Sequence, residues 1–183
     1  IKRFNTKWYQ MKSEINIGIV GAQFMGKAHT NAWYDVAQFY DFPFKVVMKA
    51  ACDVNPESED NFAKRLGWQS FEISWQKLVE RDDIDVIDIC TPNQLHMRVA
   101  VSAAKAGKHI ICEKPVEMNA SEANKMFDAA RENSVKNMVA FNYRRVPAIA
   151  LAKKMIDEGK LGKIHHFNAV YYQDWLVDPD FPW

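Results

Sequence analysis

The 183-residue chain lacks the features that mark a membrane, secreted or nucleic-acid-binding protein. Its apolar runs are far shorter than the about 20 residues that a membrane-spanning helix needs. Its 24 basic and 23 acidic residues are scattered and leave a formal charge of +1, so no basic stripe indicates nucleic acid or an anionic membrane as a partner. The first residues include basic side chains but not the apolar stretch of a secretory signal. We expect a globular protein with a small-molecule partner, no nucleic acid and no membrane.

Cysteine is also scarce. Cys52, Cys90 and Cys112 are the three in the chain, each at the end of an apolar run and none in a C-x-x-C pair. An odd number without such a pair argues against a disulfide framework and against a zinc site, so we expect no metal. The pattern favours a reducing compartment, the cytoplasm, and three small core side chains rather than a catalytic thiol.

What the chain does contain is a regular alternation of apolar runs and helical patterns. The expected strands are residues 15–20, 46–52, 68–72 (a weak one), 86–90, 109–112 and 138–141. The expected helices are residues 26–38, 58–66, 74–81, 94–106 and 120–132. Strands too apolar to have one wet face, separated by amphipathic helices, predict an α/β fold with a doubly wound parallel sheet.

The pattern divides the chain into three parts. Residues 1–14 are expected to be an N-terminal extension, with Met11 as the natural start, and residues 15–144 the doubly wound α/β domain. Residues 145–183 are expected to begin a second, α+β domain. That part is predicted to hold a helix from Pro147 to Gly159 and a long strand, Ile164 to Trp175. We therefore expect this chain to be the N-terminal part of a longer protein.

Glycine is scarce at one informative place, the stretch "GIVGAQFMGKAH". A dinucleotide loop has the pattern G-x-G-x-x-G after a strand, and here Gly21 and Gly26 are present but Gln23 replaces the middle glycine. By itself the loop fits either an ordinary tight turn or a nucleotide site. Asp53, at the end of the second expected strand, favours the nucleotide site because an acid there accepts the hydroxyls of an adenosine ribose. It would repel a 2′-phosphate, which favours NAD over NADP.

Two further motifs fall at ends of expected strands, "TPNQLH" (Thr91–His96) and "EKP" (Glu113–Pro115). Open α/β sheets bind ligands at that edge. With "FMGKAH", "CD" and "FNYR" in the same order, the chain resembles the Gfo/Idh/MocA family of nicotinamide-dependent oxidoreductases, relatives of glucose–fructose oxidoreductase and inositol dehydrogenase. The resemblance runs from Ile15 to the last residue, and the missing middle glycine is its one departure.

The resemblance implies that residues 15–144 are a dinucleotide-binding Rossmann domain with an NAD site, and that residues 145–183 begin a domain for substrate binding and oligomerisation. It also implies a role for several residues. Thr91 to Asn93, with His96, would line the nicotinamide side, and Glu113 would hold the nicotinamide ribose. Lys114 would face both cofactor and substrate and is the implied catalytic residue. The full implied cofactor-binding set is Gly21, Gln23, Phe24, Met25, Gly26, Asp53, Thr91, Pro92, Asn93, His96, Glu113, Lys114 and Asn142. For the Lys114–Pro115 peptide bond, the resemblance leaves cis and trans equally expected.

The chemistry of alcohol oxidation explains a lysine at this position. A cation beside the alcohol oxygen stabilises the developing alkoxide and can relay its proton. We therefore favour an NAD-dependent dehydrogenase that acts on a sugar, sugar acid or cyclitol. The alternatives are an NAD-dependent glycoside-cleaving enzyme of the same family and a ligand-sensing regulator without turnover. For His29 in the first helix we expect a structural role, and residues 1–183 alone are expected to bind NAD, to be inactive and to associate through residues 164–175.

Overall fold

The computed structural model describes residues 12–174 and residue 177. The expected start at Met11 and most of the expected extension lie outside the described residues. The chain forms two compact units, residues 1–141 and 142–183. Among the described residues, no helix is long and apolar enough to cross a membrane.

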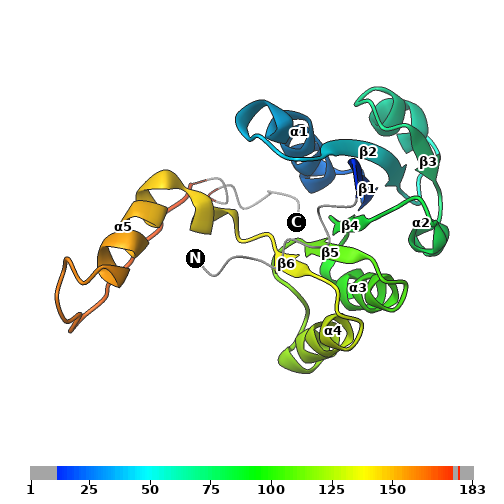
Figure 1. Ribbon diagram of the computed structural model, residues 1–183. Coiled ribbons are helices and arrows are strands. Elements are labelled where there is room, and N and C mark those ends of the chain that lie inside the picture. The colour runs from blue at the N-terminus through cyan, green and yellow to red at the C-terminus, as the bar shows by residue number, and fades with distance from the viewer. Residues whose placement is uncertain (1–11, 175–176, 178–183) are drawn as a thin grey trace. The chain divides into compact units, whose positions relative to one another are not determined.

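The first unit is built on a six-stranded parallel sheet (Figure 1). Its strands are β1 (Glu14–Val20), β2 (Lys45–Cys52), β3 (Ser70–Glu72), β4 (Val86–Ile89), β5 (His109–Cys112) and β6 (Asn137–Val139). The strand order is β3-β2-β1-β4-β5-β6, and every neighbouring pair is parallel. The predicted doubly wound α/β fold is confirmed, including the weak third strand. The order reverses between β1 and β4, which is where such sheets bind ligands.

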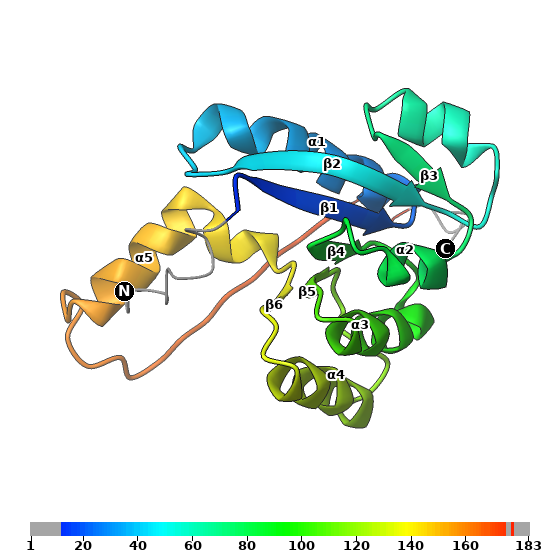
Figure 2. The ribbon, with the colours of Figure 1, turned by 45° about the vertical axis from the view of Figure 1, so that its right-hand side comes forward.

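Helices cover both faces of this sheet (Figure 2). They are α1 (Phe24–Phe39), the π-helical turn η1 (Glu59–Lys64), α2 (Trp75–Glu80), the 3₁₀ turn η2 (Asn93–Leu95), α3 (His96–Lys105) and α4 (Ala120–Glu132). One apolar core joins the sheet to α2, α3 and α4, and a second joins it to α1 and η1. Cys52, Cys90 and Cys112 are free and buried within these cores, as expected from the sequence.

Side-chain alternation along β4 places a charged residue on the face of the sheet that α1 and η1 cover. Successive side chains of a strand point to opposite faces. Ile87 and Ile89 pack into the core that contains α3, so Asp88, between them, points to the face covered by α1. Asp88 is 0% exposed. A fully buried carboxylate needs hydrogen-bonding or charged partners, and its partners belong to the site described below.

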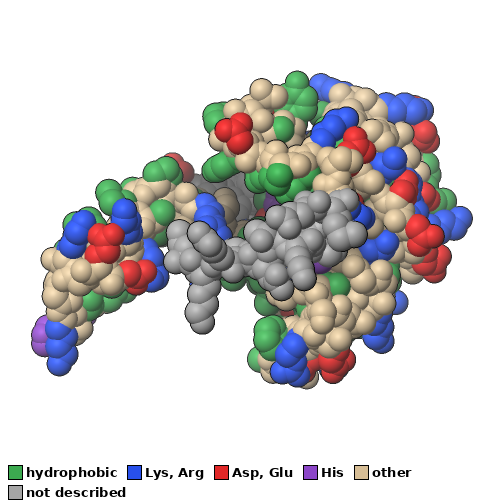
Figure 3. All heavy atoms as spheres, viewed as in Figure 1, with side chains coloured by type: hydrophobic (Ala, Val, Ile, Leu, Met, Phe, Trp, Pro, Cys, Tyr) green, Lys and Arg blue, Asp and Glu red, His purple; other side chains and the backbone are tan. Residues whose placement is uncertain are grey.

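On the face of the first unit that Figure 3 shows, Lys and Arg side chains are interspersed with Asp and Glu. This surface agrees with the nearly balanced charge of the whole sequence.

The second unit contains η3 (Asn142–Arg145) and α5 (Pro147–Asp157). Pro147 begins the helix, where its missing N–H costs no hydrogen bond, and the chain leaves the helix through Gly159 at φ +71°. This helix was predicted. The predicted strand Ile164–Trp175 is wrong for its described part, since residues 164–174 form no strand. Their aromatic and β-branched side chains favour a strand, but a strand also needs a partner for its backbone groups, and the described part of this unit contains none.

Candidate functional site

Three loops meet at the carboxyl edge of the sheet because the strand ladder continues one residue past each strand. The N–H of Gly21 donates to Cys52 O at 2.8 Å, that of Cys90 to Val20 O at 2.8 Å, and that of Glu113 to Ile89 O at 2.9 Å. The glycine loop (Gly21–Gly26), the TPN loop (Thr91–Asn93) and the EKP loop (Glu113–Pro115) therefore lie side by side along the sheet edge. They flank the point between β1 and β4 where the strand order reverses.

The glycine loop needs both of its glycines. Gly21 has φ +105°, and a Cβ there would lie 2.6 Å from Cys90 O. A Cβ on Gly26 would lie 2.0 Å from Gly21 O, so α1 can pack on β1 only with glycine at this position. These are the tight-turn and helix-packing roles of the first and third glycines in a dinucleotide loop.

Gln23 stands where the dinucleotide pattern has its middle glycine. It is the N-cap residue of α1, its side chain is exposed, and it makes no capping hydrogen bond. The first N–H groups of a helix have no partner within the helix, and together with the helix dipole they attract an anionic group such as a phosphate. The half-buried Met25 packs against the core under α1, while Phe24 is exposed. The start of α1 can thus offer backbone N–H groups to a pyrophosphate.

Asp53 is fastened to the glycine loop. Its Oδ2 accepts the N–H of Ala22 at 2.8 Å and its Oδ1 accepts the N–H of Asn55 at 2.9 Å. Each carboxylate oxygen has about two lone pairs, so each can accept a further hydroxyl. The carboxylate is half-buried beside the loop. It is thus oriented in advance for a group with two neighbouring hydroxyls, such as a ribose.

His96 fastens the TPN loop to the EKP loop. It is 0% exposed, with Nε2 2.8 Å from Thr91 O and Nδ1 3.1 Å from Pro115 O. His96 therefore braces the TPN loop against the EKP loop. The Lys114–Pro115 peptide bond, for which both isomers were expected, is cis.

One polar atom in these loops has no partner. The Oγ1 of Thr91 is buried and makes no hydrogen bond within the described part of the chain. An unpaired buried hydroxyl costs free energy unless a bound group completes its hydrogen bonding. Thr91 therefore fits a site that is completed by a polar cofactor.

The remaining expected residues differ in what the structure places around them. Pro92 is exposed and Asn93 is half-buried, both in the TPN loop. Lys114 is exposed at the sheet edge, and its backbone N–H donates to Glu113 Oε2 at 3.0 Å. Asn142 belongs to the second unit, where it begins η3 with an exposed side chain.

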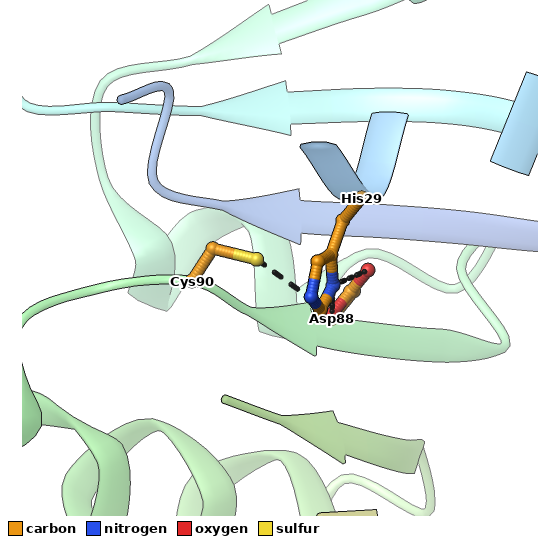
Figure 4. Close-up of side chains that lie close together, drawn as sticks. All are labelled: His29, Asp88 and Cys90. Atoms are coloured by element: carbon orange, nitrogen blue, oxygen red, sulfur yellow. Dashed lines mark hydrogen bonds and ion pairs between the residues drawn. The ribbon is translucent and has the colours of Figure 1, made fainter. Parts of the chain in front are cut away.

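Beneath these loops lies a hydrogen-bonded cluster that the sequence interpretation missed (Figure 4). His29 Nδ1 on α1 lies 2.9 Å from Asp88 Oδ1, and His29 Nε2 lies 3.0 Å from Glu113 Oε1. Trp33, one helical turn further along α1, donates its indole N–H to Asp88 Oδ2 at 2.7 Å. Helix α1 is thereby joined to the carboxylates of β4 and of the EKP loop.

The cluster determines the charge of the histidine. Burial lowers the pKa of His29, but hydrogen bonds and charges from Asp88 and Glu113 outweigh burial and raise the pKa from 6.5 to about 9. His29 is consequently an imidazolium at neutral pH. It can then donate from both ring nitrogens, as two flanking carboxylates require.

His29, Asp88 and Cys90 are close enough together to be considered as metal ligands. The 2.9 Å between the His29 nitrogen and the Asp88 oxygen is a hydrogen-bond distance, shorter than the about 3.4 Å between ligands of a tetrahedral zinc ion. Burial, followed by the charges of Asp88 and Glu113, raises the pKa of the Cys90 thiol and keeps it protonated. These groups therefore form a hydrogen-bonded network.

Two signals in the sequence could have revealed this cluster. Asp88 interrupts the apolar run "VIDIC", where a charged side chain in a buried strand needs a partner. His29 and Trp33 are four residues apart in the first helix and so share one of its faces.

Comparison with known proteins identifies the family of this chain. Residues 15–141 match the oxidoreductase family with an NAD-binding Rossmann fold. Levoglucosan dehydrogenase of Pseudarthrobacter phenanthrenivorans is 45% identical over 169 residues, and inositol 2-dehydrogenase of Rhizobium meliloti is 29% identical over 150 residues. The matches cover 92% and 82% of this chain, and the chain spans 43% of each of these relatives.

A solved structure of levoglucosan dehydrogenase in complex with NADH and levoglucosan is similar to this chain, with a TM-score of 0.89 and 45% identity. The match covers 92% of this chain and 46% of that one. The resemblance seen in the motifs is confirmed: this chain belongs to the Gfo/Idh/MocA family, the oxidoreductase family with an NAD-binding Rossmann fold.

Proposed function

We propose that the protein is an NAD-dependent dehydrogenase that transfers hydride between the cofactor and a secondary alcohol of a sugar, sugar acid or cyclitol. One observation carries this proposal. The glycine, TPN and EKP loops lie side by side where the strand order reverses between β1 and β4, and Lys114 lies at the same edge of the sheet. Two relatives, levoglucosan dehydrogenase and inositol 2-dehydrogenase, support the substrate class by their names.

The residues of the first unit can hold each part of the dinucleotide. Gly21 and Gly26 allow the turn at the start of α1, where the N–H groups of Phe24 and Met25 are available to the pyrophosphate. Asp53 accepts the hydroxyls of the adenosine ribose, which favours NAD over NADP.

The nicotinamide end is assigned to the loops after β4 and β5. Glu113 accepts hydroxyls of the nicotinamide ribose, and the unpartnered Thr91 hydroxyl, with Pro92 and Asn93, lines the nicotinamide side. His96 holds these two loops together from below. Asn142 is assigned to the nicotinamide end by family resemblance.

The bound nicotinamide supplies a hydride acceptor. Lys114 supplies the positive charge that the alcohol oxygen needs as it loses its proton, because a developing alkoxide is stabilised by a nearby cation. The ammonium group gives one of its own protons to solvent and takes up the alcohol proton in exchange, so that it stays positively charged and the proton leaves the site. The neighbouring Glu113 accepts the Lys114 backbone N–H, which fixes the start of the EKP loop.

Absorbance at 340 nm tests the proposed reaction. The full-length protein is mixed with NAD and a panel of sugars, sugar acids and cyclitols that includes levoglucosan and inositol. Steady NADH formation with at least one compound is the expected result. Release of free sugar from a glycoside without net NADH would instead support the glycoside-cleaving alternative, and ligand binding without either reaction would support the regulator.

We also propose a homo-oligomer that forms through the second domain, in the cytoplasm. Exposed apolar and aromatic side chains of the second unit support the assembly: Phe167, Val170, Tyr171 and Tyr172. Three free cysteines support a reducing compartment. Light scattering on residues 1–183, with and without the residues after Gly159, tests the assembly, and a monomer in both forms would contradict it.

A further inference from the structure

We propose that His29 is a positioning residue for the cofactor: as an imidazolium braced by Asp88 and Trp33, it holds the Glu113 carboxylate in place to bind the nicotinamide ribose. The inference rests on the proposed function, in which Glu113 is a cofactor ligand. It assigns a role to a buried cluster that otherwise has no part in the proposed chemistry.

The buried carboxylate of Asp88 fixes the orientation of the histidine. Asp88 accepts the indole N–H of Trp33 at 2.7 Å and the Nδ1–H of His29 at 2.9 Å, and it is 0% exposed. Both donors come from the same face of α1. With its Nδ1 side held in this way, the imidazole ring has its Nε2 directed at Glu113, 3.0 Å from Oε1.

Glu113 in turn is held through both oxygens. Oε1 faces His29 and Oε2 accepts the backbone N–H of Lys114 at 3.0 Å, while the residue is only 5% exposed. A carboxylate this buried stays ionised only when hydrogen bonds and an opposite charge compensate its lost hydration. Among the described residues, His29 forms an ion pair with the Glu113 carboxylate.

The arrangement also couples the two ends of the proposed cofactor site. His29 lies three residues after Gly26, in the same rigid helix whose start forms the glycine loop. The His29 side chain therefore fixes the position of the EKP loop relative to the glycine loop. The titratable groups that face His29 are Asp88 from β4, Cys90 directly after β4 and Glu113 directly after β5, and the Cys90 thiol stays protonated.

Without the imidazolium, the Glu113 carboxylate would lose the ion pair that holds Oε1 and would turn toward water. This change removes an oriented acceptor from the ribose, so NADH binding weakens. A hydrogen bond to a charged group is commonly worth enough to change an affinity about tenfold. A role in stability alone would lower the melting temperature without acting through Glu113.

A double-mutant cycle on the full-length protein separates these roles. NADH dissociation constants are measured by calorimetry at pH 7 for the wild type, His29→Gln, Glu113→Gln and the double variant, with His165→Gln as the histidine control. His29→Gln is expected to weaken binding about tenfold in the wild-type background and to have little further effect beside Glu113→Gln, because coupled residues are not additive. His165→Gln is expected to bind as the wild type does.

An equal loss from His29→Gln in both backgrounds, or no loss in either, would overturn the inference while the wild type still binds NADH. A wild type that does not bind NADH would instead overturn the proposed function, and the inference with it.

If His29→Gln does not fold, ¹⁵N NMR of the wild-type ring decides the question. Binding and protonation are reciprocally linked, so NADH is expected to raise the pKa of His29 further if the imidazolium favours the bound state. A pKa of His29 that does not change on NADH binding would overturn the inference.

Discussion

Raising the pH from 6 to 8.5 should destabilise the folded protein through His29. The pKa of this side chain is raised from 6.5 to about 9 in the folded state: burial opposes the rise, but Asp88 and Glu113 outweigh it. A group whose pKa is higher in the folded state binds protons more tightly there. Its contribution is fully present below pH 6.5 and is lost as the pH rises through 9.

The size of the effect follows from the two pKa values. They differ by about 2.5 pH units, and each unit corresponds to about 1.4 kcal/mol, so the protonated ring stabilises the fold by about 3 kcal/mol. Its side chain is 16% exposed, so solvent screens this interaction less than it screens a surface ion pair. Integration of the titration from pH 6 to 8.5 gives a loss of about 2 kcal/mol from this residue.

Urea unfolding of the wild type and His29→Gln at several pH values measures the loss. The buried cysteines also titrate on unfolding in alkaline solution, since burial raises the pKa of Cys52 and Cys112 to about 12, but both proteins share that contribution. The difference between the two stability curves should therefore shrink by about 2 kcal/mol between pH 6 and 8.5. Parallel curves would refute the assignment of His29 as an imidazolium held by two carboxylates.

Four further predictions concern the proposed cofactor site. Gly26→Ala should push α1 away from Gly21 O, cost about 1–3 kcal/mol of stability and abolish NADH binding, as thermal unfolding and calorimetry would show; a variant that binds normally would contradict the close packing. Asp53→Ala should weaken NAD binding and reduce the difference in affinity between NAD and NADP in calorimetric titrations. Gln23→Gly should leave the affinity for NAD unchanged or increase it. Lys114→Met should lower kcat at least about 100-fold in the 340 nm assay of the full-length protein, with a smaller effect on the NADH dissociation constant; unchanged turnover would exclude the lysine from proton relay.

The sequence was sufficient to predict the sheet and much of its edge, because both depend on local patterns. Apolar runs define the strands, and the residues that directly follow them, such as Asp53, Thr91 and Glu113, must lie at the carboxyl edge of a parallel sheet. The glycine loop followed similarly, since the turn between β1 and α1 lies where the sequence places Gly21 and Gly26, with Gln23 as the N-cap of α1.

Interactions between distant residues could not be predicted in the same way. His29 and Glu113 are 84 positions apart and meet only after α1 has packed on the sheet, so the first-helix histidine was interpreted as structural. The strand expected from Ile164 to Trp175 is wrong over its described residues, 164–174, for a related reason: side-chain preference is local, but the ladder that makes a strand depends on a distant partner.

Calorimetric titration of the full-length protein with NADH and NADPH most directly tests the central claim that this sheet edge is an NAD site. The account predicts saturable binding of NADH, weaker binding of NADPH, and a preference that narrows in Asp53→Ala. A folded protein that binds neither nucleotide, or binds NADPH more tightly than NADH, would contradict it.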